Sequence, residues 1–355
     1  MTIHTDDTSA HKDRVAGGLA AALLGDALGS VTEQLTVRQV RERYGRVTTL
    51  LAPAEGTFAD GRQPGELTDD GLLTLSILRE LTAGSGEIEP DNVARLLLEW
   101  ASDPELLSRF AGPSSRKAIL LLRGGATPRE AGAPDPLTND LRTSNGAAMK
   151  VAPAGWASPG DLVRAARTAA KICVTTHNSD IAYAGAAAVA GAVSAAMSPS
   201  SATDIAHAAV TTARIGNEIA RGQAIEVPGP SIPARIELAC DIATAGASIE
   251  VRIRRLGEIF GNGLPITEAV PMAIGMFVAI PDDPLDLLLK VVNLGGDSDT
   301  VAAITGAISG THKGFDALPA DMVRTLEAAN QIDVRAEASL FVDVIARRRA
   351  KESLA

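Results

Sequence analysis

Apolar residues recur along this chain at the three- and four-residue spacing of amphipathic helices, and charged residues gather between these stretches. Strand-like alternation is almost absent, and the few β-branched pieces, such as residues 46–51, are too short to build a sheet. The pattern therefore predicts an all-α fold in which helices pack on helices. The predicted helices cover residues 13–28, 72–81, 93–101, 113–122, 162–174, 181–197, 202–220, 236–243, 251–260, 266–279, 284–292, 301–310 and 337–355.

Glycine and proline mark the predicted loops, of which the clearest cover residues 51–65, 124–145 and 226–233. None of them has the length or low complexity of a domain linker, and no internal repeat of fixed period is visible. We therefore expect one large helical domain over residues 13–355. Residues 1–12 are polar and carry no apolar signal core, and we interpret them as a disordered tail.

Composition narrows the class of protein. Hydrophobic residues make up 46% of the chain and aromatic residues only 3%, so the core must be built from Ala, Leu, Val and Ile with Gly spacers. A net charge of -10 argues against a nucleic-acid partner.

Cys173 and Cys240 have no paired spacing and are interpreted as buried thiols in a reducing compartment. The longest apolar run, residues 181–197, falls short of a membrane span. We therefore expect a cytoplasmic protein with no membrane partner.

Two short acidic motifs begin two of these helical stretches, far apart in the chain. One is TDD at residues 68–70, and the other is GGDSDT at residues 295–300. Their carboxylates and hydroxyls are hard oxygen donors, which suit Mg²⁺, Mn²⁺ or Ca²⁺ better than zinc. If the two helix starts meet in space, the chain holds a site for a divalent cation, or for two.

Each acidic motif also has a purely structural interpretation. TDD is a good helix start in its own right, and the same three letters stand at residues 5–7. GGDSDT is more specific, because glycines let the backbone approach a ligand closely. Two carboxylates two residues apart repel each other unless a cation lies between them. A capped helix after a glycine turn remains the alternative.

Three further elements carry polar groups into apolar surroundings. Asp26 lies in GDALG at the end of the first helical stretch, and Glu33 follows. The run SNGAAM, residues 144–149, would offer backbone N–H groups to an anion such as a phosphate. His177 lies in the run THN before another helix. Each single residue also has a structural explanation. Asp26 could cap a helix end, Glu33 could be a surface carboxylate, and His177 could be a capping or core residue.

Taken together and in this order, the five elements resemble the ADP-ribosylglycohydrolase family. The likeness spans about residues 14–320, and GGDSDT is its most specific part. The resemblance implies a single large orthogonal bundle of helices with two Mg²⁺ or Mn²⁺ ions in a cleft. It also implies a glycosidase that hydrolyses the bond at the anomeric carbon of a ribose. The expected reaction is release of ADP-ribose from a modified protein side chain or small acceptor.

The resemblance also assigns roles to individual residues. Glu33 matches the glutamate near the scissile bond, and Asp299 is the second residue expected to be essential for catalysis. The expected metal ligands are Thr68, Asp69, Asp70, Asp297, Asp299 and Thr300. The residues expected to bind substrate are Asp26, Ser144, Asn145, Gly146, Met149, His177, Gly295, Gly296 and Ser298.

The chain departs from the family pattern at two positions beside TDD. Gly71 stands where a threonine is common, and Leu67 stands where an aromatic residue is frequent. Aromatic candidates for stacking on an adenine are few, and each is expected in the core: Phe58, Phe110, Trp156, Tyr183 and Phe260. An enzyme for a smaller N-riboside is therefore the main alternative. A crystallin-like protein without activity and a simple cation- or phosphate-binding module are the others.

Overall fold

Helices form almost all of the regular structure in the computed structural model, which describes residues 5–135 and 137–352. Within these residues no strand forms, and only three isolated bridges occur. The all-α prediction is confirmed. The helices are α1 (Thr5–Gly29), α2 (Val37–Tyr44), α3 (Asp69–Ala83), α4 (Pro90–Trp100), α5 (Pro104–Arg109), α6 (Pro113–Arg123), α7 (Pro128–Ala131), α8 (Ala152–Trp156), α9 (Leu162–Cys173), α10 (Asp180–Ala196), α11 (Ala202–Ala220), α12 (Ile232–Thr244), α13 (Ile249–Phe260), α14 (Ile266–Ala279), α15 (Pro284–Val292), α16 (Ser298–Lys313), α17 (Ala320–Asn330) and α18 (Val334–Glu352), with 3₁₀ turns η1 (Asn145–Ala147) and η2 (Phe315–Ala317).

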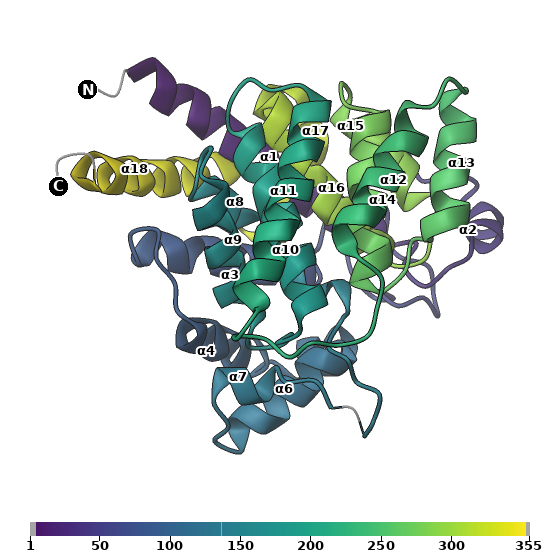
Figure 1. Cartoon of the computed structure of the whole chain (residues 1–355). Helices are drawn as coiled ribbons and strands as arrows, with labels where there is room; N and C mark the ends of the chain where they lie inside the picture. The colour runs from purple at the N-terminus through teal and green to yellow at the C-terminus, as the bar shows by residue number, and fades with distance from the viewer. Residues whose placement is uncertain (1–4, 136, 353–355) are drawn as a thin grey trace.

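The centre of the fold is the pair α1 and α16, which lie side by side although they come from opposite ends of the chain (Figure 1). Glycines allow the two backbones to touch. A Cβ atom on Gly25 would collide with the backbone of Ala302, and one on Gly306 would collide with the backbone of Ala21. This close packing brings the C-terminal end of α1 against the N-terminal end of α16. The polar residues at those two ends are thereby held next to each other.

Two hydrophobic clusters form the interior. The larger one fills the main bundle around α1, α10, α14 and α16. The smaller one lies in a lobe of α4, α5, α6 and α7, drawn at the bottom of Figure 1, and is built on Trp100, Phe110 and Ile119. Leu73 of α3 and Met149 belong to this smaller cluster and join the lobe to the bundle. The boundary between the clusters is therefore where side chains of both can face a common space.

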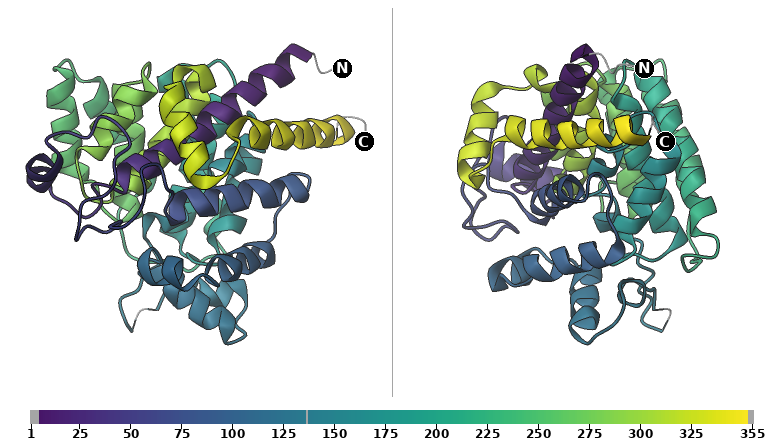
Figure 2. Two further views of the ribbon diagram at one scale, coloured as in Figure 1. Left: turned by 180° about the vertical axis from the view of Figure 1, so that it is seen from behind. Right: turned by 90° about the vertical axis from the view of Figure 1, so that its left-hand side faces the viewer.

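The start of α1 differs from the prediction. Residues 5–12 are helical rather than a disordered tail, while residues 1–4 lie outside the described residues. Lys12 forms an ion pair of 2.7 Å with Asp343, which fastens this end of α1 to α18. Figure 2 shows α1 and α18 emerging on the same side of the molecule. Contact with a distant helix, invisible in the local sequence, thus extends α1 toward the N-terminus.

The described helices also bear on two further expectations. None of those within residues 5–135 and 137–352 combines the length and hydropathy that crossing a bilayer demands. Cys173 is a buried free thiol, as expected, whereas Cys240 is only partly buried.

Candidate active site

Acidic side chains from opposite ends of the sequence line one cavity of about 390 Å³. Asp69 and Asp70 reach it from the start of α3, and Asp297 and Asp299 reach it from the start of α16. Glu33 joins them from the turn after α1. One carboxylate oxygen from each of Glu33, Asp297 and Asp299 lies within 4.8 Å of the others. The two acidic motifs therefore meet in space.

Asp26 lies behind the cavity and stabilises the start of α3 through hydrogen bonds. Its carboxylate accepts hydrogen bonds from the backbone N–H of Thr68 at 3.0 Å, from the Thr68 hydroxyl at 2.6 Å and from the backbone N–H of Gly71 at 3.0 Å. A Cβ atom at position 71 would lie 2.5 Å from Asp26 Oδ2. Glycine at this position therefore lets the carboxylate approach the helix end, which fixes the directions of Asp69 and Asp70.

The glycine turn before α16 is also fixed by close backbone contacts and a hydrogen bond. Gly295 and Gly296 have φ angles of +64° and +71°, which favour glycine. A Cβ atom on either would collide with a carbonyl, that of Leu35 or of Asn262 respectively. The Asp297 backbone N–H donates to the Asn262 carbonyl at 2.6 Å. The turn therefore sets the position at which the Asp297 carboxylate enters the cavity.

Ser298 points away from the cavity and joins α16 to α1. Its hydroxyl donates to the Gly29 carbonyl at 2.9 Å and lies 2.9 Å from the Thr32 hydroxyl. A Cβ atom on Gly29 would collide with the backbone of Asp299. Ser298 and Gly29 together place Asp299 at the end of α1.

Several residues expected to touch metal or substrate thus lie behind the cavity. The Thr68 hydroxyl donates to Asp26 and keeps its oxygen lone pairs, so its expected role as a metal ligand stays a prediction. Asp26, Gly295, Gly296 and Ser298 were expected to bind substrate, but none of them lines the cavity. The physical reason is that each is engaged in building a helix start. Their contacts make them positioning residues.

Burial of so many carboxylates raises their pKa values. Desolvation is the largest cause at each of the five acids. It acts with the charge of Asp26 to raise the pKa of Asp69 to about 8. Neighbouring carboxylates add to the rise for Glu33, Asp70 and Asp299. A cluster with these pKa values is one that a bound cation would stabilise in its ionised form.

The donor set fits a divalent cation of the magnesium or manganese type. Glu33 Oε2 and Asp70 Oδ1 are buried and have no hydrogen-bond partner among the described residues. The hydroxyl of Thr300, which also lines the cavity, hydrogen-bonds to Asp70. The acids and Thr300 offer oxygen atoms, which Mg²⁺ and Mn²⁺ prefer. The residues that could hold such ions are Thr68, Asp69, Asp70, Asp297, Asp299 and Thr300.

Residues of the SNGAAM segment and His177 form the adjoining wall of the cavity. Asn145 donates from Nδ2 to Asp297 Oδ2 at 2.6 Å, which fixes the carboxylate's orientation. His177 Nε2 lies 2.7 Å from the Ser144 hydroxyl, and Nδ1 lies 2.7 Å from the Thr176 hydroxyl. Burial lowers the pKa of His177 well below its usual value, so the ring is neutral at pH 7. Gly146 and Met149 also line the cavity.

The opposite wall comes from the lobe and the nearby loop, and the sequence analysis named only its two phenylalanines, as aromatic candidates. It includes Phe58, Arg109, Phe110, Ser115 and Arg116. The two phenylalanine rings contact edge to face, with centroids 5.5 Å apart. Both rings were expected in the core, and Phe110 does contribute to the smaller hydrophobic cluster while also reaching the cavity. The sequence signal for these two rings was that aromatic residues are few in this chain.

The other three aromatic candidates lie elsewhere, as expected of core residues. Trp156 is buried and donates from Nε1 to the Thr311 hydroxyl at 2.8 Å. Tyr183 and Phe260 are also buried, and neither lines this cavity. Any aromatic contact to a ligand here therefore comes from the lobe.

Comparison with known proteins gives consistent results. A family model described as ADP-ribosylglycohydrolase matches residues 7–352. The chain is 31% identical to the uncharacterized protein YegU of Escherichia coli over 341 residues, covering 95% of this chain and 99% of that one. It is 26% identical to ADP-ribosylhydrolase ARH3 of Bos taurus, covering 91% of each. A solved structure titled ADP-ribosylglycohydrolase-related protein complex has a TM-score of 0.66 at 21% identity, covering 95% of this chain and 99% of that one.

Proposed function

This chain belongs to the ADP-ribosylglycohydrolase family, whose members are glycosyl hydrolases, and from that premise we propose a specific reaction for it. It cleaves the ribosyl glycosidic bond that joins ADP-ribose to a protein side chain or small acceptor, with the help of two divalent cations. The observation that carries the proposal is the convergence of Glu33, Asp69, Asp70, Asp297 and Asp299 on one cavity.

The acids at the two helix starts hold the cations. Asp69, Asp70, Asp297 and Asp299 supply carboxylates, and Thr300 supplies a hydroxyl. The Thr68 hydroxyl can add an oxygen ligand, because donating its hydrogen to Asp26 leaves the oxygen lone pairs free. Bound Mg²⁺ or Mn²⁺ would orient the ribose hydroxyls, offset the substrate's negative charge and make a water more acidic. Such a role explains why so many carboxylates gather at the two helix starts.

Glu33 handles the proton at the scissile bond. Its buried carboxyl has a pKa well above the usual value, chiefly through desolvation and secondly through the charges of Asp299 and Asp297. A carboxyl with a raised pKa can give a proton to a leaving group or relay one from water at neutral pH. Glycosidic bonds break through an oxocarbenium-like state, which such proton transfer assists.

The remaining walls fix the substrate. Ser144 and neutral His177 present hydroxyl and ring groups to the ribose and its phosphate. Arg109 and Arg116 offer cations on the lobe side, which suits a diphosphate. Phe110 is only 3% exposed, so little of its face is open to an adenine. That observation favours the second candidate, hydrolysis of a smaller N-riboside at the same site.

A substrate panel with and without a chelator tests the proposed reaction. We expect ADP-ribosylated protein or an ADP-ribosyl amino acid to be hydrolysed with Mg²⁺ or Mn²⁺, and hydrolysis to stop in excess EDTA and to return on adding the metal. Free ADP-ribose and the free acceptor are the products to quantify by liquid chromatography. Turnover of a nucleoside alone would support the second candidate instead. Hydrolysis that continues undiminished in EDTA would contradict the metal-dependent mechanism.

A further inference from the structure

Arg142 is a buried cation that the proposed reaction does not use. It lies on the chain between α7 and η1, its side chain is 0% exposed, and it does not line the acidic cavity around Glu33. A buried guanidinium needs hydrogen-bond acceptors, because each donor left unpaired costs free energy of desolvation. The partners of Arg142 therefore show which parts of the fold it joins.

The Arg142 side chain reaches three segments at once. Its Nη1 donates to the Ser114 carbonyl at 2.7 Å and to the Thr176 carbonyl at 3.2 Å. Its Nη2 donates to the Ala131 carbonyl at 3.1 Å. Ser114 lies in the first turn of α6, Ala131 ends α7, and Thr176 immediately precedes His177. A guanidinium holds its donors in a rigid planar fork, so it fixes these segments relative to one another.

Two of the three segments form different walls of the acidic cavity. Ser114 lines the cavity on the lobe side, together with Ser115 and Arg116, which follow it in α6. His177 lines the other side, and its Nδ1 lies 2.7 Å from the Thr176 hydroxyl. Because Nη1 of Arg142 bonds to the carbonyls of both Ser114 and Thr176, it sets the spacing between the lobe wall and the His177 wall.

The backbone of Arg142 is fixed as well. Its φ is +54°, in the left-handed region that residues other than glycine rarely adopt. Such a conformation persists where the surrounding contacts enforce it. The Arg142 N–H donates to Asp140 Oδ1 at 3.3 Å, and its carbonyl accepts from the Ser179 hydroxyl at 2.9 Å. Asp140 Oδ2 also lies 3.0 Å from Nε of Arg142 and 3.4 Å from Nζ of Lys117 in α6. The guanidinium therefore projects from a rigid turn.

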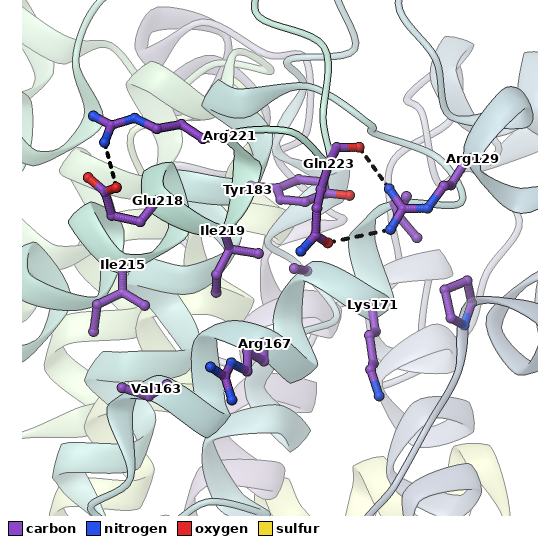
Figure 3. A pocket seen from close by; sticks show the side chains of 13 residues that line it. Arg129, Val163, Arg167, Lys171, Tyr183, Ile215, Glu218, Ile219, Arg221 and Gln223 are labelled. Atoms are coloured by element: carbon purple, nitrogen blue, oxygen red, sulfur yellow. Dashed lines mark hydrogen bonds and ion pairs between the residues drawn. The ribbon is translucent and has the colours of Figure 1, made fainter.

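Other contacts between the lobe and the bundle act differently. Leu73 and Met149 join the lobe through apolar packing, which has no preferred direction. Arg129 of α7 donates to the Gln223 carbonyl at 2.7 Å and to the Gln223 side-chain oxygen at 3.4 Å (Figure 3). Neither Arg129 nor Gln223 lines the acidic cavity. These contacts hold the lobe on the bundle, whereas those of Arg142 reach the residues of the cavity walls.

We propose that Arg142 is a positioning residue that fixes the spacing of the lobe wall and the His177 wall, and thereby the affinity for the ribosyl substrate. The inference rests on the proposed function, in which these two walls hold the substrate. Among the described residues, no hydrogen bond or ion pair joins Arg142 to Glu33 or to the acids at the two helix starts. Its loss should therefore impair binding more than the chemical step.

Substitution of Arg142 tests this role in the full chain with Mg²⁺, at a temperature well below the unfolding temperature of each variant. We expect Arg142→Met to weaken binding of ADP-ribose about tenfold in calorimetric titration, as for the loss of one hydrogen bond to a charged group. The KM for hydrolysis should rise by a similar factor, while kcat changes much less. Arg142→Lys keeps the charge without the planar fork and should restore the affinity only in part.

The matched control is Arg14→Met. Nη1 of Arg14 also donates to three carbonyls, those of Ala196, Thr311 and His312, at 2.8–3.1 Å. None of these residues lines the acidic cavity. The control removes a comparable set of hydrogen bonds, so it should lower the unfolding temperature while binding ADP-ribose as the wild type does.

Amide hydrogen exchange gives a second measurement that does not depend on activity. Arg142→Met should speed exchange in residues 113–118 and 176–179, whereas Arg14→Met should leave both segments unchanged. Unchanged exchange and unchanged ADP-ribose affinity in Arg142→Met would overturn the proposal. An equal loss of affinity in Arg14→Met would do the same, because it would reduce the effect to one of general stability.

Failure of the proposed function would be visible separately. A wild-type protein that neither binds nor hydrolyses ADP-ribose would refute that function and, with it, the role of Arg142 in substrate affinity. The exchange comparison would still decide whether Arg142 holds the two walls together.

Discussion

Replacing Asp299 with alanine is expected to lower kcat/KM by about a thousandfold or more while leaving the helical fold intact. The Asp299 carboxylate is buried, lines the acidic cavity and lies among three other acids at the two helix starts. Loss of a single hydrogen-bond donor from a preorganised oxyanion site costs about 10²–10³ in rate. Loss of a metal ligand should cost at least as much. Steady-state hydrolysis of an ADP-ribosylated substrate with added Mg²⁺ measures the effect.

The loss should not come from unfolding. Asp299 raises the pKa of Glu33 by its charge, and its own pKa is raised by desolvation and by Asp70. Removing it relieves repulsion within the metal-free cluster, so the variant without metal should unfold at the wild-type temperature or above it. Asp282→Ala, which alters an exposed acid, is the matched control and should keep full activity. Full activity in Asp299→Ala would refute the assignment.

Divalent cations are expected to stabilise the protein more strongly as the pH rises from about 4 to about 8. Burial and the charge of Asp26 raise the folded-state pKa of Asp69 from 3.8 to about 8. In this window the folded, metal-free protein keeps protons that the unfolded chain has lost, so its stability falls as the pH rises. Cations bind the deprotonated carboxylates, so their stabilising effect grows over the same window.

Thermal unfolding with Mg²⁺ and with EDTA, measured across this pH range, gives the comparison. At a cation concentration about a hundred times the Kd, the gain in unfolding free energy should be about 2.7 kcal/mol. Asp297→Asn should abolish most of the gain, whereas Asp282→Asn should retain it. A gain that is independent of pH, or that is largest at pH 4, would show that cations act elsewhere than on these acids.

The long helices were predictable because their apolar faces repeat over several turns. The prediction succeeded for α10, α11 and α14, whose buried faces are almost wholly apolar. It missed α2, in which Val40 is the buried residue and charged residues dominate. It also missed α17, which buries only Met322, Val323 and Leu326. Such helices exist because of capping and contact with the bundle, which the local pattern does not reveal.

The sequence predicted which chemical groups line the acidic cavity, but it did not predict which residues hold those groups in place. TDD and GGDSDT were recognisable in the sequence as helix starts rich in oxygen ligands. The roles of Glu33 and His177 came from the family resemblance. The sequence could not separate residues that face the cavity from residues that support it. Asp26 and Ser298 have the same polar character as their neighbours, but their hydrogen bonds point into the protein.

The lobe wall could not be predicted, because it depends on how two hydrophobic clusters meet. Phe58 lies in a loop and Arg116 lies in α6, and neither belongs to a recognisable motif. They reach the cavity because the smaller hydrophobic cluster of the lobe includes Leu73 of α3 and Met149, which follows η1.

Anomalous scattering from crystals grown with Mn²⁺ tests the central claim most directly. The claim is that carboxylates from the first quarter and the last fifth of the chain together hold divalent cations. It predicts two anomalous peaks in the acidic cavity, bounded by Asp69 and Asp70 on one side and by Asp297 and Asp299 on the other. A crystal with Mn²⁺ bound only at surface acids, and no peak within this cavity, would contradict it.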